Sequence, residues 1–276
     1  MAWVFNRCRR RGGIAVTSGE KFLEESRHYR QADSVASQPA QPAQPAKLPQ
    51  PAAAEAGPAE AGPAEAGAEA GPAVELPRPR RDGGAGLWQM LQERRSIRDY
   101  TRSPLSPEEL GQLLWAQNGR LGVEGPKDRR TAPSAGARYA VETYAVVSNV
   151  AGVAPGLYHY DARGHRLVPR RLGDMAQAVA AAAYDQGMAA EAALVLAWTA
   201  VAERTCARYG QRGYRYLFLD AGHIGQNLHL AVAAMGLGCC MVGSFYDDEV
   251  NALIGVDGVR EVVVYMATVG RPAAGA

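Results

Sequence analysis

The chain has 276 residues, 47% of them hydrophobic, and its 30 lysine and arginine residues outnumber its 28 aspartate and glutamate residues by only two. This length suits one large domain or two small ones, and the near-neutral charge argues against a dedicated nucleic-acid binder. No apolar run approaches the roughly 20 residues of a membrane-spanning helix, and no apolar stretch of a signal peptide follows the basic start of the chain.

The first 85 residues do not have a globular composition. Residues 38–79 consist almost entirely of proline, alanine, glutamine, glutamate and glycine, and include the near-repeat AEAGPAEAGPAEAGAEAGPA. So few large apolar side chains cannot offset the entropy lost on ordering the backbone. We therefore expect a disordered or extended region over 1–85, with a linker over 38–79, and one folded domain over 86–272.

The folded region opens with a short predicted helix over 86–94, followed by Arg94-Arg95-Ser96-Ile97-Arg98. Three guanidiniums and a hydroxyl within five residues could bind one phosphate monoester, because arginine offers charge-assisted and often bidentate hydrogen bonds to phosphate oxygens. Taken by itself, such a cluster is also typical of a solvated basic turn.

Ser106-Pro107-Glu108-Glu109 predicts a helix start, with an N-cap serine, a proline in the first turn and a glutamate at the third position. This helix is expected to end near Asn118-Gly119. The next predicted elements are a strand over 142–148, a hairpin with arms 156–160 and 166–168, an alanine-rich helix over 174–184 and a buried strand over 192–199.

A long helix is predicted from about Tyr214 to Met235, with an apolar stripe at alternating spacings of four and three. A short strand or loop over 239–243, a helix over 247–254 and a final strand over 261–270 follow. Helices and strands interleave, so the fold class is α+β or α/β, with a sheet between helices.

Six segments in order resemble the FMN-dependent nitroreductase family, and specifically its SagB-type (azoline dehydrogenase-like) branch. They are RRSIRDY (94–100), TAPSAGAR (131–138), PGLYHYD (155–161), ARYGQRGYRYLFLDAGHIGQNL (207–228), AMGLGCCMVGSF (234–245) and VVVYMATVGRP (262–272). The resemblance implies a three-layer α+β fold with a central mixed sheet flanked by helices. It also implies FMN as cofactor and a flavin site at a homodimer interface.

The resemblance further implies which residues contact FMN. The arginine cluster would bind the phosphate and ribityl chain, a second segment would reach the flavin of the partner subunit, and a third would offer backbone N–H groups to the isoalloxazine. One basic residue after the final strand would complete the phosphate site. These residues are Arg94, Arg95, Ser96 and Arg98; Pro133, Ser134 and Ala135; Met241, Val242 and Gly243; and Arg271.

The expected catalytic residues are Arg208 and Tyr209. Azoline dehydrogenases carry a Lys-Tyr pair at this place, and here arginine replaces the lysine. Arginine stays protonated, so it cannot act as a base, whereas Tyr209 could still donate or accept a proton. Two roles for Arg208 stay open: orienting an anionic or carbonyl substrate, and forming a surface ion pair.

Other polar residues carry weaker expectations. His223 and His229 lie six residues apart with no zinc-binding motif, so no metal site is expected. Asp220, Gln226 and their polar neighbours could line the flavin cavity, but a buried network at a dimer interface is the favoured interpretation. Cys239 and Cys240 are interpreted as small buried thiols, and the cysteine pattern as that of a reduced cytoplasmic protein.

Three functions follow from the resemblance. The first is a ping-pong reductase of nitro or quinone-type acceptors, with NAD(P)H bound transiently over the flavin because no GxGxxG motif is present. The second is a dehydrogenase that oxidises thiazoline or oxazoline rings, together with peptide-modifying partner proteins. The third is a non-catalytic flavin-binding docking subunit. The expected partners are a second copy of the chain and small molecules, with no nucleic acid and no membrane.

Overall fold

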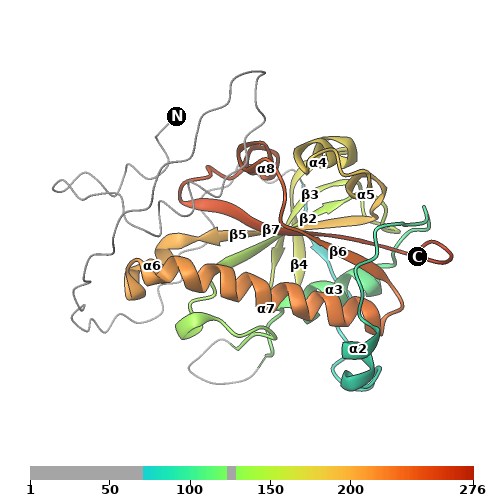
Figure 1. The fold of residues 1–276 in the computed structure, drawn as a ribbon, viewed down its shortest axis with the longest axis horizontal. Helices are drawn as coiled ribbons and strands as arrows, with labels where there is room; N and C mark the ends of the chain where they lie inside the picture. The colour runs from blue at the N-terminus through green and yellow to red at the C-terminus, as the bar shows by residue number, and fades with distance from the viewer. Residues whose placement is uncertain (1–70, 123–128) are drawn as a thin grey trace, which may run out of the picture.

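A seven-stranded sheet lies between two layers of helices, with the long helix α7 crossing one face (Figure 1). The computed structural model describes residues 71–122 and 129–276. Predictions for residues 1–70, which include most of the linker, lie outside the described residues. The strands are β1 (Val74–Glu75), β2 (Val141–Val147), β3 (Gly156–Asp161), β4 (Arg166–Leu172), β5 (Leu194–Val201), β6 (Gly238–Val242) and β7 (Glu261–Gly270).

The helices form two groups, one on each face of the sheet. They are α2 (Leu87–Glu93), α3 (Pro107–Asn118), α4 (Ala176–Ala182), α5 (Gly187–Glu191), α6 (Ala202–Tyr209), α7 (Arg212–Ala234) and α8 (Asp247–Ile254), with a 3₁₀ turn over Ala135–Ala137. Helices α3 and α7 cover one face, and α4, α5 and α8 cover the other, which confirms the expected three layers (Figure 1).

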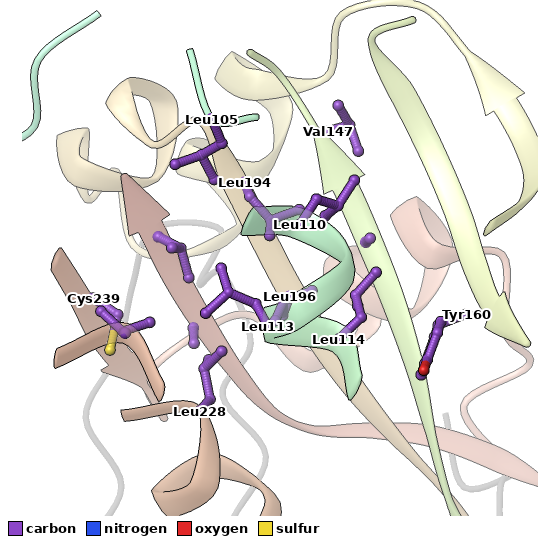
Figure 2. Close-up of a cluster of buried hydrophobic side chains, with 14 of the residues drawn as sticks. Leu105, Leu110, Leu113, Leu114, Val147, Tyr160, Leu194, Leu196, Leu228 and Cys239 are labelled. Atoms are coloured by element: carbon purple, nitrogen blue, oxygen red, sulfur yellow. The ribbon is translucent and has the colours of Figure 1, made fainter. Parts of the chain in front are cut away.

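The core between the sheet and the α3–α7 layer is built from leucines. Figure 2 shows Leu110, Leu113 and Leu114 of α3 next to Leu194 and Leu196 of β5, and all five side chains are fully buried. Each buried leucine contributes about 2 kcal/mol of transfer free energy. The apolar stripes predicted for α3 and the strand around 192–199 therefore hold these elements together.

Two predicted helices appear with the expected ends. At the start of α3 the Ser106 hydroxyl accepts a hydrogen bond from the Glu109 backbone N–H at 3.2 Å, and the Ser106 N–H donates to the Glu109 carboxylate at 2.7 Å. This reciprocal pair satisfies two of the donors that a helix start leaves open. Helix α8 begins with three acidic residues and ends at Gly255, whose φ of 82° suits glycine.

The expected mixed sheet is wrong: every pairing between the named strands is antiparallel, in the order β1-β4-β3-β2-β5-β7-β6. The interleaved helices suggested parallel neighbours. Strands β5 and β6 do run in the same direction, because both are antiparallel to β7. However, β7 comes from the end of the chain and inserts between them, so no parallel pair forms.

Two further features differ from the sequence expectation. Strand β1 lies within the predicted extended linker but pairs with β4, and the Leu76 N–H donates to the His165 carbonyl at 3.3 Å. Helix α6 was not predicted, because its sequence AERTCARY is short, half polar and without a large aliphatic side chain. Within residues 71–122 and 129–276, no helix is long and apolar enough to span a bilayer.

Candidate functional site

The arginine segment, defined as residues 94–98, covers the outer edge of the sheet. Arg94 ends α2, and the Ile97 N–H donates to the Cys239 carbonyl of the edge strand β6 at 2.8 Å. Just beyond the segment, the Tyr100 hydroxyl donates to the Ile97 carbonyl at 2.7 Å and lies 2.8 Å from the Thr268 hydroxyl. A main-chain bond therefore fixes the segment to β6, and the Tyr100 side chain anchors the following residues to β7.

Two glycines allow this close approach. A Cβ at Gly238 would lie 2.8 Å from the Ile97 side chain, and one at Gly270 would lie 2.8 Å from the Tyr100 ring. Real Cβ atoms do not come this close to another side chain, so a larger residue at either place would push the segment away from the sheet.

The polar side chains of the arginine segment are exposed or half-buried. Arg94 is half-buried, while Arg95, Ser96 and Arg98 are exposed. The Arg95 guanidinium also contacts the Ala276 carbonyl. Three guanidiniums and a hydroxyl on a rigid backbone suit a phosphate dianion, whose oxygens accept charge-assisted hydrogen bonds.

Arg271 is bonded within the chain. Its guanidinium donates to the two Glu109 carboxylate oxygens at 3.0 and 2.8 Å and to the Pro104 carbonyl at 3.1 Å. Glu109 also closes the N-terminal cap of α3. A role for Arg271 in binding phosphate stays a prediction, and it would have to compete with this ion pair.

The serine loop, defined as residues 133–139, is attached to α7. The Ser134 hydroxyl donates to the Asp220 carboxylate at 2.7 Å, and the Ala135 N–H lies 3.2 Å from both carboxylate oxygens. Pro133 is exposed beside them. Burial raises the pKa of Asp220, while the bonds from Ser134 and Ala135 favour the ionised form.

Tyr209 lies against the same loop. A Cβ at Gly136 would lie 2.4 Å from the Tyr209 hydroxyl, so the phenol reaches the loop backbone. The Tyr209 ring packs edge-on against Tyr216 with centroids 5.0 Å apart, and the exposed Arg208 guanidinium lies 5.4 Å from the Tyr209 centroid. The two predicted catalytic residues are thus beside the serine loop.

The predicted flavin-facing strand β6 packs on the middle of α7. A Cβ at Gly225 of α7 would lie 2.7 Å from the terminal methyl of Met241, while Val242 is buried and Gly243 is exposed beyond the strand end. Because Cys239 of the same strand accepts the bond from Ile97, the arginine segment and residues 241–243 are close together along β6.

Helix α7 contacts these parts at different levels. Asp220 holds the serine loop, Gly225 meets Met241, and the His229 Nδ1 lies 3.4 Å from the Cys239 sulfur. At 1.5 Å per residue, Asp220 and His229 are about 14 Å apart along the helix. Within one chain the structure therefore groups the arginine segment with 241–243, and the serine loop with Tyr209.

The vicinal cysteines do not have the properties of reactive thiols. Burial raises the pKa of Cys239 to about 12, so its thiol stays protonated at neutral pH. The same burial lowers the pKa of His229, the neighbour of that thiol. In the part of the chain that the structure describes, no group of three or more His, Cys, Asp or Glu side chains could hold a metal ion.

Sequence reasoning missed a buried charged cluster at the α6 end of the sheet. Arg204 of α6 pairs with Glu142 of β2 and donates to the Tyr139 carbonyl at 3.2 Å, while the His159 Nε2 lies 3.1 Å from Glu142. Burial opposes ionisation of Glu142, but the hydrogen bond from His159 and the charge of Arg204 bring its pKa down to about 2. Charged residues within apolar runs, such as Glu142 in VETYAVV, were the available signal.

A second carboxylate, Glu261, lies in the same cluster. It accepts hydrogen bonds from the Thr199 hydroxyl at 2.5 Å and the Tyr144 hydroxyl at 3.0 Å. Burial raises its pKa, and the nearby charge of Glu142 acts in the same direction. The cluster therefore holds one strongly ionised carboxylate next to one that resists ionisation.

These features define an α+β protein of three layers, with an arginine-rich segment at one sheet edge and a serine-containing loop against a tyrosine. Residues 91–271 match the nitroreductase family, and the chain belongs to it. Membership places the chain among the oxidoreductases.

Individual relatives agree with this membership. Protein MJ1384 of Methanocaldococcus jannaschii, named as a nitroreductase, is 38% identical over 185 residues, which are 67% of this chain and 90% of the relative. The trifolitoxin-processing protein TfxB of Rhizobium leguminosarum bv. trifolii is 31% identical over 134 residues, 47% of this chain and 36% of TfxB. A crystal structure from Anabaena variabilis, also titled as a nitroreductase, has a TM-score of 0.59 and 31% identity, over 67% of this chain and 38% of its own.

Proposed function

We propose that the protein binds FMN and passes two electrons between two substrates in a ping-pong reaction. The observation that carries this proposal is the arginine segment, fixed to β6 by the Ile97–Cys239 hydrogen bond next to residues 241–243. A phosphate at the segment would place a flavin ring along β6. When bound, FMN supplies the hydride-accepting and hydride-donating chemistry, and the chain supplies position and access.

The residues present fit such a cofactor. Arg94, Arg95, Ser96 and Arg98 match the donors that a phosphate monoester requires. Gly243 is exposed at the end of β6, where a backbone N–H could approach a flat ring. The expected contacts of Met241 and Val242 would also be through the backbone, because the Val242 side chain is buried in the core.

We further propose that the working unit is a homodimer in which the serine loop of one subunit contacts the flavin of the other. Two observations support this arrangement. The serine loop lies about 14 Å along α7 from the level of the arginine segment. Leu219 of α7 is 53% exposed, so a partner subunit packed on this face of the helix would bury its side chain.

For the reaction itself, we propose NAD(P)H-dependent reduction of nitro or quinone-type acceptors. The names of the M. jannaschii and A. variabilis relatives support it. The position of Arg208 supports it too, because a permanently charged guanidinium beside Tyr209 suits an anionic or carbonyl substrate and cannot serve as a base.

A second candidate is oxidation of thiazoline or oxazoline rings in a peptide, in company with peptide-modifying proteins. The similarity to TfxB, named as a trifolitoxin-processing protein, favours it. Tyr209 would then exchange the substrate proton, with its hydroxyl held near the Gly136 backbone.

The test is the visible spectrum of the purified protein, recorded before and after anaerobic addition of NADPH or NADH. A flavin spectrum that bleaches within the mixing time supports the reductase. A bound flavin that stays oxidised contradicts the reductase and favours the dehydrogenase or a non-catalytic docking subunit. Protein that takes up no FMN on incubation overturns the flavin proposal itself.

A further inference from the structure

Asp220 joins the long helix to the serine loop through one carboxylate. Its side chain is 4% exposed, and it accepts hydrogen bonds from the Ser134 hydroxyl at 2.7 Å and the Ala135 N–H at 3.2 Å. Ser134 in turn accepts from the Tyr139 N–H at 2.8 Å. One carboxylate thus organises both ends of the loop, directly at Ala135 and through Ser134 at Tyr139.

The loop needs this support because its backbone is strained. Gly136, Ala137 and Tyr139 have φ angles of 59°, 55° and 46°, in the left-handed region. For a residue with a Cβ this conformation costs about 1 to 2 kcal/mol, and it persists only where the surroundings enforce it. Asp220 is one such constraint, and the Arg204 bond to the Tyr139 carbonyl is another.

We propose that Asp220 is a positioning residue for the flavin site: its carboxylate holds Ser134 and Ala135 in the conformation that contacts the flavin of the partner subunit. This inference rests on the proposed function. It assigns a functional role to a residue that the sequence alone placed in a buried polar network at a dimer interface. Tyr209 depends on the same loop, since its hydroxyl lies against Gly136.

The first experiment compares FMN binding by wild-type protein with that of Asp220→Asn, Ser134→Ala and the exposed-carboxylate control Glu191→Gln. An asparagine removes the negative charge and offers one acceptor oxygen in place of two, so the charge-assisted bonds from Ser134 and Ala135 are both weakened. We expect the Asp220→Asn Kd for FMN to rise about tenfold or more, with a smaller rise for Ser134→Ala and none for Glu191→Gln. Circular dichroism verifies that each variant is folded, and Asp220→Glu, which keeps the charge but moves the carboxylate by one methylene, carries the test if Asp220→Asn is not.

A second experiment separates positioning from general destabilisation. Asp220→Asn is co-expressed with Arg94→Ala/Arg98→Ala under a different affinity tag, and the mixed dimer is purified on both tags. One of its two sites combines an intact arginine segment from the first chain with an intact serine loop from the second. We expect that site to bind FMN with wild-type affinity, giving about half the flavin content of the wild-type dimer.

The outcomes are distinct. Unchanged FMN affinity in Asp220→Asn overturns the positioning role and leaves the proposed function standing. A mixed dimer without a site of wild-type FMN affinity overturns the contact across subunits. Wild-type protein that binds no FMN at all overturns the proposed function and this inference together.

Discussion

The arginine segment and the serine loop are held in place by different kinds of interaction. A main-chain hydrogen bond from Ile97 to β6, the Tyr100 hydroxyl on β7 and close contacts over two glycines fix the arginine segment. The serine loop instead depends on the charged side chains Asp220 and Arg204. A site built on backbone register resists changes of pH, whereas one held by carboxylates responds to their protonation. The two halves of the proposed site should therefore fail under different conditions.

The largest effect is expected at the arginine segment. Arg94→Ala/Arg98→Ala removes two of the three guanidiniums, so we expect colourless protein with FMN affinity lower by about a hundredfold or more. Flavin content after purification and an FMN titration measure it. The matched control is Arg166→Ala/Arg260→Ala, which removes two arginines elsewhere on the surface. Full flavin occupancy in the first variant would show that this segment does not bind the phosphate.

The second largest effect is expected in the cluster beneath the serine loop. Glu142→Gln leaves the buried Arg204 guanidinium without its carboxylate, so we expect the free energy of unfolding at neutral pH to fall by about 3 kcal/mol. Urea titration measures the change against Glu191→Gln, whose carboxylate is exposed. If Glu142→Gln lowers the free energy of unfolding no more than Glu191→Gln does, the Arg204–Glu142 pair contributes little to stability.

The same cluster predicts a pH dependence. The pKa of Glu142 is lowered from 4.5 to about 2, so its stabilisation is present above pH 4.5 and is lost as the pH falls toward 2. The wild-type protein should lose stability steeply over this window, and Glu142→Gln should lose less. Parallel slopes in urea titrations across the window would contradict this assignment.

A moderate effect is expected from crowding the arginine segment. Gly238→Ala brings a methyl group against Ile97, so we expect a loss of about 1 to 3 kcal/mol and weaker FMN binding at any pH. The control Gly187→Ala adds a methyl group where no other atom lies within 4 Å. If Gly238→Ala binds FMN as tightly as wild type, the packing of Ile97 on Gly238 does not contribute to FMN binding.

The smallest effect is expected at Arg271. Its pair with Glu109 is partly exposed, so Arg271→Ala and Glu109→Gln should each cost about 1 kcal/mol or less. Comparing the FMN affinity of the two variants sharpens the assignment. Equal FMN affinities would mean that Arg271 only stabilises α3 through its ion pair with Glu109. A loss of FMN affinity in Arg271→Ala alone would place Arg271 in the phosphate site.

Local signals in the sequence predicted much of the fold. The capping box of α3, the ends of α8 and the bounds of β7 appear as expected, because each depends on residues adjacent in the chain. The family was also identifiable from motifs spread over the folded region. The insertion of β7 between β5 and β6 was not predictable, because alternation shows which residues are buried but not which strand is the neighbour.

The candidate site was only partly predictable for the same reason. Clustered arginines are visible in the sequence, but the bond that places them on β6 joins Ile97 to Cys239, far away in the chain. Asp220 was noticed as one of several polar residues on α7, and nothing local linked it to Ser134. Helix α6 was missed because it is short and half polar, and because nothing local links Arg204 to Glu142, with which it forms a buried pair.

The place of β7 also governs the order in which the protein is completed during synthesis. Among residues 71–122 and 129–276, strand β6, to which the arginine segment is bonded, has β7 as its one neighbouring strand. Until residues 261–270 leave the ribosome, β6 lacks that neighbour. Such long-range pairing is slow to form. If the arginine segment binds FMN as proposed, binding has to wait until β7 is made, and a product truncated before β7 should bind none.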